Sequence, residues 1–195
     1  MENNLVIKAE NSKSYLGFWI YILTDCVVFA SLFAVYATLH NNTNGGESAQ
    51  ILFSMPLALT QTIILLTSSL TSGLAIIAAL GKNRSRILLW TVATFLLGAL
   101  FLFLELREFN HLVAMGDSWR SSGFLSSYFI LVGTHGLHIL IGLIWMIVLG
   151  LIIMKKGLTA KSMKGLVMFN LFWHFLDVIW IFIFSVVYLM GHVGL

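Results

Sequence analysis

Residues 124–154 read FLSSYFILVGTHGLHILIGLIWMIVLGLIIM. A helix needs about 20 apolar residues to cross a bilayer, and this run contains no Asp, Glu, Lys or Arg. The chain as a whole is 59% hydrophobic and only 10% charged. Because a soluble domain carries about 25% charged residues, the sequence predicts an integral membrane protein.

Four other apolar runs have the same character, so we expect an all-α fold, a polytopic membrane helix bundle with five transmembrane helices. An N-terminal tail, residues 1–16, has no cleavage signal, and the apolar run after it is too long for a signal-peptide core. The rest, residues 17–195, forms a single membrane domain. Its five helices are predicted at about residues 17–39, 52–80, 87–109, 124–154 and 166–190.

The Lys and Arg residues predict the orientation of the helices. Nine of them lie in the tail and in the connections 81–86 and 155–165, whereas two lie in the connections on the other side. Lys and Arg accumulate in cytoplasmic loops, so we expect the tail in the cytoplasm and the C-terminus outside. Topology explains the basic residues, and no nucleic-acid partner is expected.

Two histidine motifs lie at membrane depth. Residues 133–138 read GTHGLH, and residues 173–177 read WHFLD. Side chains three positions apart share one helix face. His135 and His138 therefore share a face of their helix, and so do His174 and Asp177. An ionised Asp at the centre of a membrane helix costs at least about 2.5–3.5 kcal/mol. We therefore expect these side chains to face protein or water.

The motifs allow two interpretations. Three histidines and a carboxylate are suitable ligands for a metal or haem iron. Alternatively, His135, His138, His174 and Asp177 form a polar clasp that orients two helices, with a cross-helix hydrogen bond between His138 and Asp177. We favour the clasp because a membrane di-iron enzyme needs more histidines, so no catalytic, cofactor or metal residue is expected.

Two further groups of ionisable residues need an explanation. Asp25, in the first span, must be protonated, paired, or open to water or headgroups. Both a role in proton or lipid handling and a structural hydrogen bond remain open for it. Glu105, Glu108 and His111 share one face near the predicted outer interface, where we expect a solvated helix end with the carboxylates paired to Arg107.

Several motifs together resemble subunit III of the haem–copper respiratory oxidases. They are GFW at 17–19, TD at 24–25, GTHGLH at 133–138, WHFLDVIW at 173–180 and VYLMG at 187–191. The resemblance covers nearly the whole chain after residue 15. It extends only to the last five of the seven helices that many members have, and this short form is most similar to subunit III of bacterial cytochrome o ubiquinol oxidases.

The resemblance implies a non-redox structural subunit of a proton-pumping quinol oxidase in the bacterial cytoplasmic membrane. Haems and copper would belong to subunit I, and no cofactor is expected on this chain. Subunit III would pack against subunit I, in a complex with subunits II and IV, hold phospholipid in a cleft and support proton uptake. Asp25 stands where many members have a glutamate facing that cleft. The two helices that this chain lacks would come from another subunit.

Three alternatives remain from the sequence. Five-helix versions also occur in some cytochrome c oxidases, so both quinol and cytochrome c remain open as the electron donor. A stand-alone histidine-ligated membrane redox protein would use the same histidines. A small proton-coupled transporter is disfavoured because the sequence has no internal repeat and no broken helices.

Overall fold

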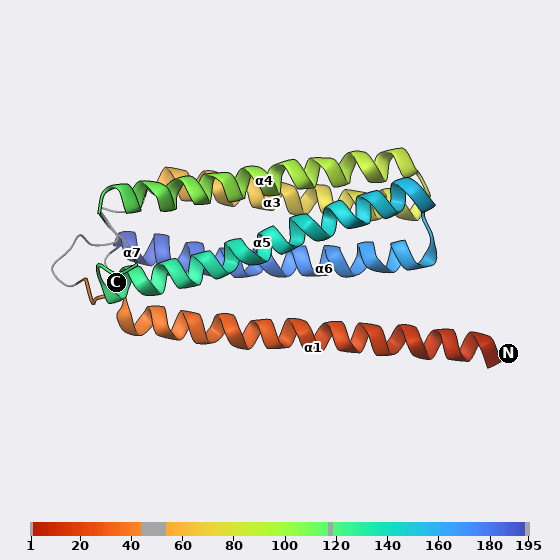
Figure 1. Cartoon of the computed structure of the whole chain (residues 1–195), viewed down its shortest axis with the longest axis horizontal. Helices are drawn as coiled ribbons and strands as arrows, with labels where there is room; N and C mark the ends of the chain where they lie inside the picture. The colour runs from red at the N-terminus through yellow and green to blue at the C-terminus, as the bar shows by residue number, and fades with distance from the viewer. Residues whose placement is uncertain (1, 44–53, 117–118, 194–195) are drawn as a thin grey trace.

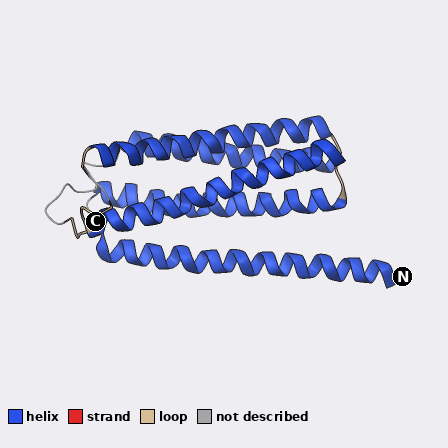
Figure 2. Cartoon of the chain, viewed as in Figure 1, coloured by secondary structure: helices blue, strands red, loops and turns tan. Residues whose placement is uncertain are grey.

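The computed structural model describes residues 2–43, 54–116 and 119–193, and within these ranges the regular structure is entirely helical (Figures 1 and 2). Five of the described helices contain segments long and apolar enough to cross a membrane, which confirms the all-α prediction of a multi-pass protein. The helices are α1 (Glu2–Leu39), α3 (Met55–Leu80), α4 (Arg84–Ala114), α5 (Gly123–Lys156), α6 (Ala160–Ile183), the π-helical turn η1 (Phe184–Leu189) and α7 (Met190–Val193).

Side-chain caps mark where three of these helices begin. The side chains of Asn83, Ser122 and Thr159 accept hydrogen bonds from backbone N–H groups in the first turns of α4, α5 and α6. Such caps satisfy N–H groups that have no partner inside the helix. Helix α1 has no separate start at the membrane. It begins at Glu2, so the predicted tail continues the first span as helix.

Helices α3, α4, α5 and α6 form a four-helix bundle in which each packs against two neighbours. Buried residues recur along α4 at alternating spacings of four and three, and α3 shows the same repeat. This seven-residue repeat is typical of left-handed bundles, in which side chains of one helix fit between those of the next. The buried residues of α4 are Ile87, Thr91, Thr94, Gly98, Phe101, Glu105, Glu108 and Leu112.

Trp173, one of two fully buried tryptophans, packs against two glycines. A Cβ atom added at Gly98 would lie 2.8 Å from Trp173 Cζ2, and one added at Gly142 would lie 2.7 Å from Cζ3. Real Cβ atoms do not approach this closely. The indole of α6 therefore fills a recess that exists because α4 and α5 carry no side chain there.

Helix α1 lies beside the bundle and packs mainly against α5 and α6 (Figure 1). One stripe of α1 is buried: Ile22, Asp25, Phe29 and Tyr36. An apolar stripe on the opposite side is exposed: Leu16, Trp19, Ile20, Leu23 and Val27. The bundle end at which α3 joins α4, and α5 joins α6, lies toward the N-terminal end of α1 (Figure 1). We call it the basic end, because seven Lys and Arg residues lie near it: Lys82, Arg84, Arg86, Lys155, Lys156, Lys161 and Lys164.

Candidate functional site

A carboxyl–imidazole pair joins α1 to the bundle. Asp25 Oδ2 lies 3.6 Å from His138 Nε2 of α5. The other ring nitrogen of His138, Nδ1, donates to the Thr134 carbonyl at 2.8 Å, which fixes the orientation of the ring. Phe29 packs on the imidazole with ring centroids 5.3 Å apart, and Tyr21 lies beside Asp25. Asp25 is only 8% exposed, so its carboxyl faces the bundle.

The predicted hydrogen bond between His138 and Asp177 is wrong. His138 faces α1, whereas Asp177 accepts a hydrogen bond from Ser69 of α3. The two side chains therefore leave α5 and α6 in different directions, although they lie at similar depth. The role of the four predicted clasp residues in orienting helices remains a prediction.

The other two clasp residues also lie apart. His174 is exposed, and its Nδ1 donates to the Asn170 carbonyl at 2.9 Å. His135 is fully buried against Trp180, with ring centroids 5.3 Å apart. Across the described part of the chain, no three His, Cys, Asp or Glu side chains gather as a metal site.

Glu105 and Glu108 do not lie at a solvated helix end, so that prediction is wrong. They are 2% and 6% exposed and face the bundle, whereas Arg107 and His111 are exposed. A sequence signal marks this. Glu105 follows Gly98 by seven residues and Glu108 follows Phe101 by seven, so both carboxyls occupy core positions of the α4 repeat.

These carboxyls belong to a buried group that four helical segments supply. Tyr188 Oη donates to Glu108 Oε2 at 3.3 Å, and the hydroxyls of Tyr128 and Tyr188 are 3.1 Å apart. Gln61 lies beside Glu108. We call this group the carboxylate cluster: Gln61, Glu105, Glu108, Tyr128, His135 and Tyr188.

The π turn η1 places Tyr188 in this cluster. In a π-helix, hydrogen bonds join residues five apart, so Ile183 and Tyr188 lie one turn apart on the same side, and both are buried. Along a regular α-helix, with 3.6 residues per turn, residues five apart point in different directions. The wide turn therefore directs the phenol toward Glu108. The apolar run predicted at 166–190 contains no sequence signal for this turn.

A second polar group lies nearer the basic end. Trp173 Nε1 donates to Ser68 Oγ at 3.0 Å, and Ser72 Oγ donates to Asn170 Oδ1 at 2.7 Å. The hydroxyls of Thr71 and Thr94 are 2.8 Å apart. We call this group the hydroxyl cluster: Ser68, Ser69, Thr71, Ser72, Thr94, Asn170 and Trp173. Its side chains form hydrogen bonds with one another across helices.

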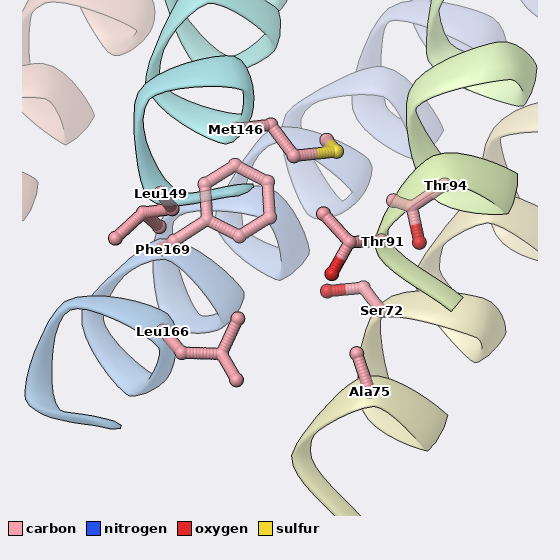
Figure 3. A pocket seen from close by; sticks show the side chains of 8 residues that line it. All are labelled: Ser72, Ala75, Thr91, Thr94, Met146, Leu149, Leu166 and Phe169. Carbon is pink, nitrogen blue, oxygen red and sulfur yellow. The ribbon is translucent and has the colours of Figure 1, made fainter. Parts of the chain in front are cut away.

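A small cavity adjoins the hydroxyl cluster (Figure 3). Its volume is about 10 Å³, near the smallest that admits one water molecule. Two of its hydroxyls already donate, Ser72 to Asn170 Oδ1 and Thr91 to the Ile87 carbonyl at 2.8 Å. The remaining lining is largely apolar: Ala75, Met146, Leu149, Leu166 and Phe169, with Thr94. This space offers a ligand few free partners.

Comparison with known proteins shows the family. The family described as cytochrome c oxidase subunit III matches residues 7–192. The chain belongs to this family. The resemblance to oxidase subunit III that the motifs predicted is confirmed. The predicted similarity to subunit III of bacterial ubiquinol oxidases is confirmed as well.

Relatives of this subunit III cover nearly its whole length. Subunit 3 of the cytochrome bo(3) ubiquinol oxidase of Pseudomonas aeruginosa is 51% identical over 179 residues, 92% of this chain and 86% of that protein. A cytochrome c oxidase subunit 3 of Bacillus sp. (strain PS3) is 46% identical over 193 residues, 99% and 92% of the two chains. A quinol oxidase subunit 3 of Bacillus subtilis is 42% identical over 180 residues, 92% and 88% of the two chains.

Proposed function

We propose that this subunit III serves a proton-pumping terminal oxidase that takes electrons from quinol and reduces dioxygen. The 51% identity to the Pseudomonas aeruginosa ubiquinol oxidase subunit carries the proposal. In this assignment the chain is structural and non-redox, it stabilises subunit I in a complex with subunits II and IV, and haems and copper remain in subunit I. The complex resides in the bacterial cytoplasmic membrane.

We further propose that phospholipid binds where α1 meets the bundle. Exposed apolar side chains need a lipid or protein neighbour, and beside this junction Ile141, one turn along α5 from His138, is 47% exposed. The pair of Asp25 and His138 supplies polar groups at the junction. Lipid held here would stiffen the contact between α1 and α5, and so support the surface that subunit I uses for proton uptake.

Copurification tests the assignment. An affinity-tagged chain, extracted in mild detergent, is expected to retain subunits I, II and IV and to consume oxygen with ubiquinol. The second candidate is a cytochrome c oxidase, because the relative from Bacillus sp. (strain PS3) is named cytochrome c oxidase subunit 3. Rapid oxygen consumption with reduced cytochrome c, and none with ubiquinol, would establish that candidate instead. A haem Soret band from the isolated chain would contradict the non-redox assignment.

Variants of Asp25 distinguish its two possible roles. If the role is structural, Asp25→Asn leaves assembly, turnover and pumping nearly intact, and Asp25→Leu impairs assembly. If the carboxyl buffers protons for subunit I, the assembled Asn variant turns over slowly at high pH, where protons are scarce. Thr24→Val is a matched control, because the exposed Thr24 hydroxyl bonds only its own helix, at the Ile20 carbonyl.

Orientation needs its own test. Reporter fusions at Gly81 and Gly157, in the basic connections, are expected in the cytoplasm. Fusions at Gly45 and Leu195 are expected outside. A cytoplasmic C-terminus would contradict the proposed arrangement.

A further inference from the structure

We propose that the carboxylate cluster is a water-binding site inside the bundle, with ordered water joining Glu105 to His135 and completing the hydrogen bonds of Glu108 and Gln61. The site adjoins the junction of α1 and α5 at His135, whose ring centroid is 6.5 Å from that of Phe29. It belongs to the four-helix bundle, so it does not depend on the identity of the electron donor.

Unpartnered polar atoms are the first observation. Seven side-chain atoms of the cluster have no hydrogen-bond partner among the described residues. They are both polar atoms of Gln61, of the Glu105 carboxyl and of the His135 ring, and Oε1 of Glu108. Gln61 and His135 are 0% exposed, and Glu105 is 2% exposed. Buried groups of this kind are costly unless a partner satisfies them.

Convergence of these atoms is the second observation. Glu105 Oε1 lies 3.1 Å from the point where a Cβ of Gly136 would stand, so the carboxyl rests on α5 at the residue that follows His135. Gln61 of α3 lies within hydrogen-bond reach of Glu108 of α4. The π turn adds Tyr188, whose hydroxyl is already bonded to Glu108. Three helices and the wide turn thus direct polar groups into one region.

The chemistry of these groups favours water over a cation. A neutral imidazole has one donor and one acceptor, and an amide has two donors and an oxygen acceptor. Water donates and accepts, so it satisfies both kinds of group, whereas a metal ion takes only acceptors. Within the described ranges, no three His, Cys, Asp or Glu side chains stand close enough to hold a metal.

Two tryptophans of α6 offer an internal comparison. Trp180 is 1% exposed and lies against His135, and its ring centroid is 6.2 Å from that of Tyr188. Trp173 is 0% exposed and lies in the hydroxyl cluster, bonded to Ser68. Both indoles are shielded from the surface. Only Trp180 adjoins the proposed water.

X-ray hydroxyl-radical footprinting of the purified oxidase complex tests the site, because radicals formed from bound water oxidise the side chains beside it. Trp180 is expected to be oxidised several-fold faster than Trp173. Glu105→Gln, which keeps two polar atoms, should preserve this ratio, and Glu105→Leu should reduce it toward one. Equal slow oxidation of both tryptophans in the wild-type complex would overturn the proposal.

A high-resolution structure of the same complex provides the second measurement, and it does not depend on whether the Leu variant assembles. Density for water is expected within hydrogen-bond distance of Glu105 and His135, and of Glu108 and Gln61. A direct bond between Glu105 and His135 with no water beside them would overturn the proposal. Density for a metal ion at the cluster would also overturn it.

Discussion

The two halves of the bundle differ in how their buried polar side chains are hydrogen-bonded. The hydroxyl cluster lies in the half nearer the basic end, and the carboxylate cluster lies in the opposite half. In the hydroxyl cluster, Ser68 and Ser72 bond to Trp173 and Asn170 of the facing helix. In the carboxylate cluster, the larger side chains Glu105 and His135 have no partner in the described chain. Short hydroxyl side chains also bond carbonyls of their own helix, as Ser68 does with Leu65. The Glu105 carboxyl and the His135 ring therefore require a partner from elsewhere, whereas the buried Asp177 carboxyl, beside the hydroxyl cluster, accepts from Ser69.

The largest expected effect on the free energy of unfolding comes from replacing the two buried tryptophans by alanine. Trp173→Ala should lower the free energy of unfolding by about 3–5 kcal/mol, because the recess between Gly98 and Gly142 is left as a cavity. Trp180→Ala should cost less, because water can fill a cavity bordered by polar His135 and Tyr188. SDS titration of the complex in mixed micelles measures both. An equal or larger loss for Trp180 would contradict the difference between the halves.

Added methyl groups probe the same difference by crowding. Gly142→Ala should cost about 1–3 kcal/mol, because the new Cβ would lie 2.7 Å from the Trp173 ring, which cannot move away. Gly136→Ala should cost less, because its neighbour at 3.1 Å is the end of the flexible Glu105 side chain. Gly133→Ala is the matched control on α5, with Phe109 at 3.8 Å. The same titration should rank the three variants in this order.

Removing one hydroxyl tests the polar contacts of the carboxylate cluster. Tyr188→Phe should destabilise the chain by about 1–3 kcal/mol, because Glu108 and Tyr128 each lose a partner in a buried site. Tyr15→Phe is the control, since Tyr15 is 39% exposed and its ring contact with Lys164 survives the change. If the two variants had equal stability, Tyr188 Oη would contribute nothing to the fold.

The smallest expected effect belongs to the hydroxyl cluster. Ser72→Ala removes a donor from Asn170, which is only half-buried, and should cost about 0.5–1.5 kcal/mol. Thr67→Val is the control, because its exposed hydroxyl bonds only its own helix at Ile63. SDS titration should show a slightly lower free energy of unfolding for Ser72→Ala than for Thr67→Val. A larger loss for Ser72 than for Tyr188 would reverse the comparison between the clusters.

Much of the fold follows from composition. Apolar runs alone located the five membrane-spanning helices, because the length needed to cross a bilayer leaves little freedom. The ends of the helices were less predictable. Helix α4 begins at Arg84 and continues to Ala114, beyond the predicted range of 87–109. The cap at Asn83 and the buried Leu112 account for the extra turns.

The polar site was less accessible to sequence analysis. Equal depth in the membrane allowed His138 to meet Asp177, but depth does not specify the direction in which a side chain points. That direction depends on which helices are neighbours, and in this fold His138 points toward α1, where it pairs with Asp25. Glu105 and Glu108 looked like interfacial charges, although their place in the seven-residue repeat of α4 marked them as core.

The position of α1 has a consequence for biogenesis. Helix α1 is synthesised before α3 and α4, yet it packs mainly against α5 and α6, which follow them. In membranes, helices insert individually before they associate. Helix α1 therefore stays unpacked in the lipid while α3 and α4 are synthesised. Until α5 is made, Asp25 has no His138 with which to pair. The synthesis of α1 and its packing against α5 are thus separated by the synthesis of two other helices.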